Sequence, residues 1–124
     1  MKKILTLAMI VMASVSSLFT IKAAAETTSP SYPGGETAMT SFIAANLHYP
    51  EYAKENGIEG VIPVGFVVKK DGTLADVKVL RYLDPDMEAE AIRVVTLMPK
   101  WTPALQDGTP IDAPATVEIK FINE

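Results

Sequence analysis

Apolar residues recur at helical spacing in two stretches of the chain. The first stripe follows an i, i+3, i+4, i+8 pattern and comprises Met39, Phe42, Ile43 and Leu47. It predicts an amphipathic helix over residues 36–46, which must end before Pro50 because the proline ring disfavours helix in the preceding residue. The second stripe comprises Met87, Ala91, Ile92, Val95 and Met98. It predicts a helix that opens with Asp84 as N-cap and Pro85 at the first helical position, and that stops at Pro99.

Between these two helices the apolar positions alternate, which is typical of strands. Residues 61–69 predict one strand, and residues 74–82 predict the strand that returns after the Asp71-Gly72 turn, since such turns need positive φ. Pro63 lies inside the first strand and has no N–H to donate. We therefore expect its nitrogen to face an unpaired side or a bulge.

Three further segments complete the predicted order of elements. Residues 51–56 favour a short helix that Gly57 closes as a left-handed cap. Residues 101–105 are extended, and a turn over residues 106–110 leads to a final strand over residues 116–122. In this strand one face carries Val117, Ile119 and Phe121, and the other carries Thr116, Glu118 and Lys120. Tight turns join antiparallel neighbours, so the simplest architecture is α+β, with one antiparallel sheet and helices packed on its apolar face.

The N-terminal segment has the pattern of an export signal. Two lysines, an apolar stretch over residues 4–21 and three alanines ending at Ala25 predict a signal peptide over residues 1–25. The alternative is an uncleaved membrane anchor, because the stretch is close to the roughly 20 residues that span a bilayer. Residues 26–35, rich in Thr, Ser, Pro and Gly, are expected to form a short linker to a domain over residues 36–124.

Composition limits the classes of function. The 124 residues suffice for about one domain, and 48% hydrophobic with 21% charged residues is ordinary for a globular chain. The net charge is -4, and loss of residues 1–25 would remove three lysines and no acid, so nucleic-acid binding is not expected. The chain has no cysteine, which excludes a disulfide scaffold, a thiol catalyst and a cysteine-based zinc site.

No arrangement of residues favours catalysis. His48 is the single histidine, and a solvated or capping role is favoured for it because no serine lies in a nucleophile elbow. The acids Asp71, Asp76, Asp84 and Asp86 do not follow the spacing of a calcium loop. Trp101 is expected to pack in the core rather than to bind a ligand. We therefore expect a binding module with no enzymatic activity, no metal and no cofactor.

An ordered set of motifs resembles the C-terminal domain of the TonB energy-transducer family. The motifs are Tyr49-Pro50 with Ala53, Gly57-Ile58-Glu59-Gly60, Val64-x-Phe66-x-Val68 with Asp71-Gly72, Val77 and Val79, and Met98-Pro99-Lys100-Trp101 with Pro103 and Ala104. Upstream, Pro33-Gly34-Gly35 and the stripe of residues 39–47 resemble an extra helix of the Bacteroidetes-type branch. The resemblance covers nearly all of the chain after residue 31.

The resemblance implies a periplasmic domain with helices on one face of a three-stranded antiparallel sheet. In that family the domain binds the TonB box, a short segment of an outer-membrane transporter, as an extended strand beside its last strand. Carried over by position, the docking edge comprises Thr116, Val117, Glu118, Ile119, Lys120 and Phe121. The motif residues Tyr49, Pro50, Glu59 and Gly60 are expected to frame the first strand. A terminal strand at a sheet edge would leave N–H and C=O groups free for such pairing.

Two departures from the family favour a free-standing periplasmic copy of the domain. Residues 26–35 replace the long Pro-rich spacer of full-length transducers and reach at most about 36 Å. The apolar stretch over residues 4–21 holds no histidine and no charge, whereas a proton-coupled anchor needs an ionisable group. Two alternatives stay open: a transducer anchored in the inner membrane, which is the one case with a membrane contact, and a domain that forms a homodimer through the same edge.

Overall fold

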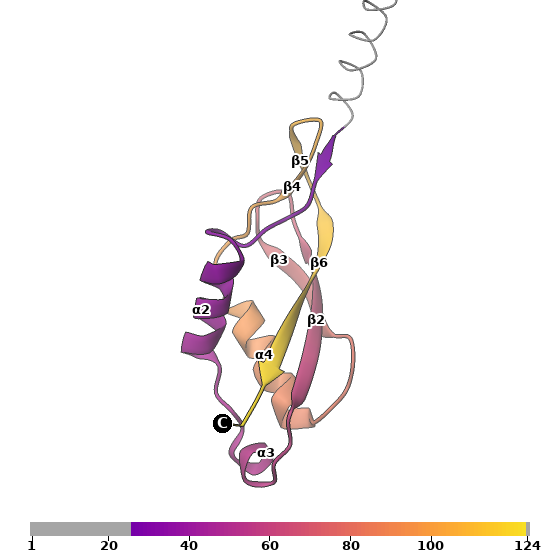
Figure 1. The fold of residues 1–124 in the computed structure, drawn as a ribbon. Helices are drawn as coiled ribbons and strands as arrows, with labels where there is room; N and C mark the ends of the chain where they lie inside the picture. Colours follow the sequence, from indigo (N-terminus) through magenta and orange to yellow (C-terminus); the bar gives the residue numbers. More distant parts are fainter. Residues whose placement is uncertain (1–25, 124) are drawn as a thin grey trace, which may run out of the picture.

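The main sheet confirms the α+β class. The computed structural model describes residues 26–123, so the expected signal peptide over residues 1–25 lies outside the described residues. Three antiparallel strands form the main sheet in the order β3-β2-β6. They are β2 (Gly60–Val68), β3 (Leu74–Val79) and β6 (Ala113–Phe121), with β2 in the centre (Figure 1).

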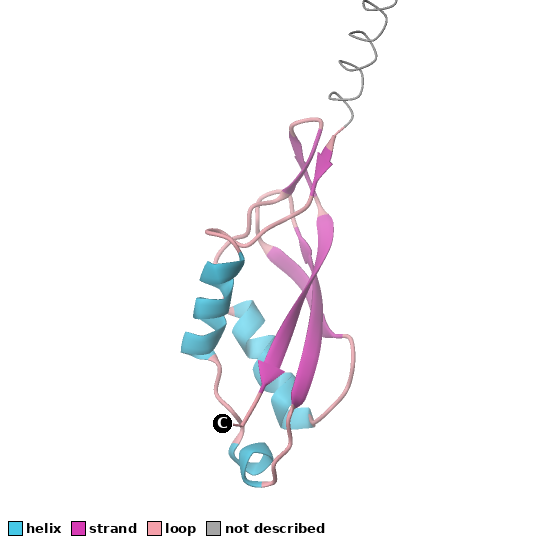
Figure 2. Cartoon of the chain, viewed as in Figure 1, coloured by secondary structure: helices cyan, strands magenta, loops and turns pink. Residues whose placement is uncertain are grey.

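A second, smaller sheet corrects the expectation of a single sheet. It comprises β1 (Thr27–Thr28), β4 (Ala104–Gln106) and β5 (Thr109–Ile111), and it projects at one end of the molecule (Figure 2). The hairpin between β4 and β5 closes at Asp107 and Gly108, which both have positive φ. The alternation of apolar and polar residues could not reveal this sheet, because its strands are only two or three residues long.

Part of the expected linker is attached to this small sheet. Leu105 donates its backbone N–H to Oγ1 of Thr28 over 3.1 Å, and Ser31 exchanges two backbone hydrogen bonds with Thr102, over 3.0 and 2.8 Å. Tyr32 is buried in the core. The segment 26–35 is therefore held by backbone pairing and one aromatic ring, which its polar composition did not indicate.

The helices follow from their local sequence signals. They are α2 (Glu36–Asn46), α3 (Glu51–Glu55) and α4 (Pro85–Thr96). The bounds of α2 match the prediction, and Gly57 ends α3 with a φ of 66°, as expected for a left-handed cap. At the start of α4, the Asp84 carboxylate accepts hydrogen bonds from the backbone N–H groups of Asp86 and Met87. This N-cap satisfies two of the donors that a helix start leaves free.

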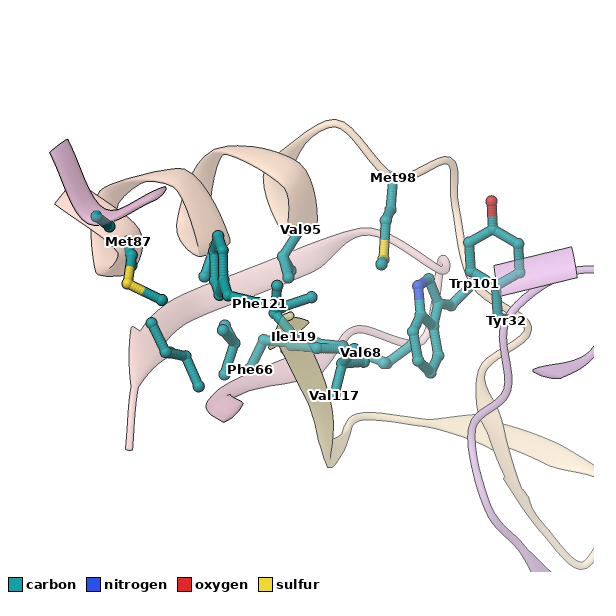
Figure 3. Close-up of a cluster of buried hydrophobic side chains, with 14 residues drawn as sticks. Tyr32, Phe66, Val68, Met87, Val95, Met98, Trp101, Val117, Ile119 and Phe121 are labelled. Carbon is teal, nitrogen blue, oxygen red and sulfur yellow. The ribbon is translucent and has the colours of Figure 1, made fainter. Parts of the chain in front are cut away.

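The core lies between α4 and the main sheet (Figure 3). Met87, Ala91, Val94 and Val95 of α4 are buried, and Met87, Ala91 and Val95 form one cluster with residues of the sheet, namely Ile62, Val64, Phe66, Val68, Val117, Ile119 and Phe121. Ile92 was expected in this stripe but is only half-buried, because Val94 and not Ile92 lies on the helical face that contains Met87, Ala91 and Val95. Trp101 is buried, as expected, and packs edge-on against Phe66 and Tyr32.

We predict that Phe66→Ala lowers the free energy of unfolding by about 3–5 kcal/mol, because it removes a buried ring and leaves a cavity. Phe66 is 3% exposed, and its ring centroid lies 5.1 Å from that of Trp101. Chemical denaturation followed by tryptophan fluorescence measures this change. Tyr82→Ala is the control, since Tyr82 is 83% exposed. Equal stability of the two variants would contradict the assignment of Phe66 to the core.

Candidate functional site

β6 is an edge strand of the main sheet. Its residues pair with β2 in a continuous register from Gly60 opposite Phe121 to Val68 opposite Ala113. Among residues 26–123, no strand pairs with its other side. The predicted docking residues, Thr116–Phe121, therefore lie together on one strand with a free flank.

Two hydrogen bonds show which way the backbone of β2 points. The carbonyl of Pro63 accepts from the N–H of Leu80 over 2.9 Å, and the carbonyl of Val61 accepts from Nη2 of Arg81 over 2.7 Å. Both donors follow β3, so the odd-numbered residues at the start of β2 direct their backbone groups toward β3. The missing N–H of Pro63 is thus on the β3 side, opposite Leu80, where β3 has just ended. The even-numbered residues in this part of β2, such as Ile62 and Val64, direct their backbone N–H and C=O groups toward β6.

The register then fixes which groups of β6 are free. Ile62 lies opposite Ile119 and Val64 opposite Val117, so these partners exchange the hydrogen bonds between the two strands. Thr116, Glu118 and Lys120 lie between them and direct their N–H and C=O groups to the open edge. These three residues offer alternating donors and acceptors to an additional strand.

The N-terminal end of this open edge is closed by Pro114. Pro114 shares the outward phase of Thr116 but has no N–H, so the first outward donor after it is that of Thr116. Asp112 holds the chain just before β6, since its carboxylate accepts the N–H of Lys70 over 2.7 Å and forms an ion pair with Lys69. These contacts, that of the Lys70 N–H first, lower the pKa of Asp112. The contacts of Asp112 thus fix the position at which β6 begins.

The C-terminal end of β6 is held by residues of the recognised motifs. The ring of Tyr49 packs edge-on against Phe121, with centroids 5.7 Å apart, and its hydroxyl donates to the carbonyl of Ile58. Burial, and after it the charge of Glu59, raises the pKa of Tyr49. Glu59 accepts the N–H of Asn123 over 2.8 Å. Tyr49 and Glu59 therefore meet the end of β6 at the start of β2.

The other motif residues lie away from the open edge. Gly72 has a φ of 90°, and a Cβ there would come within 2.5 Å of the carbonyl oxygen of Trp101, so only glycine fits this turn. Asp71 accepts hydrogen bonds from the hydroxyl and the N–H of Thr73, which lower its pKa. Pro50 precedes α3, and Pro103 lies between the Ser31–Thr102 bridge and β4. These residues shape the turns around the sheet.

A groove of about 830 Å³ runs between the open edge of β6 and α2. From α2 and the residue that follows it, the groove is lined by Glu36, Met39, Thr40, Ile43, Ala44 and Leu47. From β6 and its end, it is lined by Thr116, Val117, Glu118, Lys120 and Ile122. No residue of α2 is fully buried, because its apolar stripe is shared between the core and this groove.

An ion pair on α4 fixes the C-terminal end of α2. Arg93 donates to both carboxylate oxygens of Glu90, over 2.8 and 2.6 Å, and its Nη2 also donates to the carbonyl of Asn46 over 2.7 Å. Glu90 accepts the backbone N–H of His48 over 2.6 Å. The sequence gives no sign of this cluster, because the contacts that join it to the end of α2 cross more than 40 positions of the chain and end on backbone atoms. His48 takes part through its backbone rather than through its ring.

The described residues show neither a metal site nor a membrane span. No group of three or more metal-ligating side chains occurs within residues 26–123. In the same part of the chain, no helix has the length and hydropathy needed to cross a bilayer.

Comparisons with known proteins agree with this fold. A family model described as the Gram-negative bacterial TonB protein C-terminal matches residues 45–122. Two solution structures of the Helicobacter pylori TonB C-terminal domain are similar to this chain, each with 22% identity and a TM-score of 0.53. Each similarity covers 68% of this chain, and 89% and 77% of the two solved chains. None of the curated proteins matches this chain.

We predict that Glu90→Gln destabilises the protein in a pH-dependent way. The hydrogen bond from Arg93, and after it that from the His48 N–H, lowers the pKa of Glu90 against the effect of burial. A lowered folded-state pKa stabilises the fold above the unfolded value of about 4.3, and this contribution is lost as the pH falls through the folded pKa. At neutral pH we expect a loss of about 1.5–3 kcal/mol.

Thermal unfolding of both proteins between pH 7 and pH 2 measures this effect. The difference in melting temperature should be largest near neutral pH and should shrink as the solution becomes acidic. Glu55→Gln is a suitable control, since Glu55 is exposed and has no hydrogen bond or ion pair among the described side chains. A difference that stays constant down to pH 2 would show that the charge of Glu90 does not hold α2.

Proposed function

The chain belongs to the family of Gram-negative bacterial TonB C-terminal domains, and on that premise we propose that it engages a segment of an outer-membrane transporter by strand addition along β6. The observation that carries this proposal is the row of outward backbone groups at Thr116, Glu118 and Lys120. An added strand would satisfy these groups without disturbing the pairing of β6 with β2. The partner is then the TonB box, as the family implies.

Binding of this kind needs no reacting group. Main-chain hydrogen bonds supply affinity, and the alternate side chains of the added strand supply specificity. The site offers a free edge with exposed side chains on one face and the α2 groove on the other. The protein is therefore proposed to act as a binding module of TonB-dependent transport and not as an enzyme.

The proposed location is the periplasm, which is where this family of domains works. The export pattern of residues 1–25 supports a mature chain that starts at Glu26. Sequencing the N-terminus of the protein recovered from the periplasmic fraction tests this. Glu26 is the expected first residue, whereas Met1 in a membrane fraction would favour the anchored transducer.

The same free edge is also suited to pair with a second copy of the chain. A homodimer through β6 would bury the outward groups of Thr116, Glu118 and Lys120 in place of a transporter segment. Light scattering over a range of concentrations distinguishes the two. A stable dimer whose β6 amides are protected from exchange would favour the homodimer.

We predict that Glu118→Pro weakens binding of TonB-box peptides about tenfold or more. The substitution removes the central outward N–H and leaves every hydrogen bond between β2 and β6 in place. A loss of about 1.4 kcal/mol in binding free energy corresponds to tenfold in Kd. Two-dimensional NMR titration measures both the affinity and the residues whose amide signals shift.

Glu118→Ala is the matched control, because it removes the same side chain and keeps the N–H. It should bind clearly more tightly than Glu118→Pro, and the shifted signals should centre on Thr116–Phe121. Equal binding by both variants, or shifts confined to other elements, would rule out pairing along β6.

A further inference from the structure

The groove beside β6 has a wall that the family comparison does not include. Residues 36–44 of α2 lie outside the matched range of residues 45–122. They nevertheless contribute most of the side chains on this side of the groove, among them Met39, Ile43 and Ala44. The selectivity of this wall therefore depends on residues of this chain that the family model does not cover.

The direction of side chains in a sheet determines what would enter the groove. Residues directly opposite each other on neighbouring strands project to the same face. In a strand added beside β6, residues opposite Val117 and Ile119 would thus project to the face of these two buried side chains. That is the face on which α2 stands, since Met39 and Ile43 of the helix pack against the buried cluster that contains Val117 and Ile119. Every second guest side chain would point at α2.

The spacing along α2 matches the spacing along a strand. Met39, Ile43 and Leu47 are each four residues apart, which is a rise of about 6 Å per interval. Side chains on one face of a strand repeat every two residues, or about 6.6 Å. The three apolar residues therefore border two intervals, each of which accommodates one side chain of a guest strand. The whole stretch, about 12 Å, corresponds to about four guest residues.

We propose that α2 is a selectivity wall: through Met39, Ala44, Ile43 and Leu47 it favours extended partner segments with apolar side chains at every second position. The proposal rests on the proposed function, because the guest must already pair with β6. Its occupant is a strand of another protein, since the groove borders free backbone donors and acceptors along its length. Apolar side chains of the guest strand would cover the part of the apolar stripe of α2 that is still exposed.

The hydrogen bonds at the end of α2 hold this wall at its distance from the strand. Arg93 and Glu90 bind the backbone of Asn46 and His48, and Tyr32 in the core precedes the first turn of the helix. A wall fixed at both ends keeps the groove open without a guest. Apolar side chains can then enter a preformed site, so that binding carries no free-energy cost for reorganising the helix.

The experiment compares two neighbouring positions on α2. Ala44 lines the groove and Ala45 does not, while both are exposed. Ala44→Glu places a carboxylate in the groove, and Ala45→Glu adds the same charge and helix-forming residue outside it. Thr40→Glu and Ser41→Glu form a second pair with the same relation to the groove, which serves if the first pair does not fold.

Two short synthetic peptides with terminal lysines are the probes. One alternates threonine and valine, and the other carries serine in place of each valine. With the unchanged protein we expect the valine peptide to bind about tenfold tighter or more, because burying valine is favourable by more than 1.4 kcal/mol. Ala44→Glu should bring the ratio of the two affinities close to one, and Ala45→Glu should leave it unchanged.

The outcomes separate this proposal from the proposed function. An unchanged ratio in both variants, with loss of all binding in Glu118→Pro, would overturn the role of α2 and leave strand addition standing. If neither these peptides nor TonB-box peptides shift the signals of β6, both proposals fail. A concentration-dependent dimer that Ala44→Glu disrupts would show that a second copy, and not a partner segment, fills the groove.

Discussion

In a β-strand, the face on which a side chain lies and the direction of its backbone N–H are coupled, because both alternate with a period of two. In β6 this coupling decides the function of each residue. Val117, Ile119 and Phe121 turn their side chains to the core and their backbone to β2. The residues between them turn their backbone to the open edge. The same alternation therefore stabilises the fold and leaves a binding edge, and a shift of one residue would destroy both.

Local signals predicted most of the regular structure. The bounds of α2, the Asp84 cap of α4, the left-handed Gly57 and the hairpin turn at Gly72 all follow from residues near each other in the chain. The strand β1 did not, because two threonines carry no apolar alternation and gain their place from pairing with β4. Ile92 was wrongly placed because neighbouring positions at the edge of a helical stripe differ little in pattern.

The site could be predicted only in part. The terminal strand was predicted from its alternating apolar and polar residues, whereas its role as the docking edge came from the family resemblance. The groove could not be foreseen, because it depends on the distance between α2 and β6, which the contacts of Arg93 and Glu90 set. Those contacts join a side chain to a backbone carbonyl, and a carbonyl has the same chemistry in every residue. Sequence alone therefore gives no sign of such an anchor.

The short pairing between β1 and β4 has a mechanical consequence. Two residues of β1 pair with β4, whereas nine residues of β6 pair with β2. Tension applied at Glu26 would therefore reach the weakest ladder first and peel β1 away before it loaded the main sheet. Ser31 is held by Thr102, so the released segment would be residues 26–30, which span at most about 18 Å when fully extended. A pull on the N-terminal end would therefore be taken up at the small sheet before it disturbed the pairing of β6 with β2.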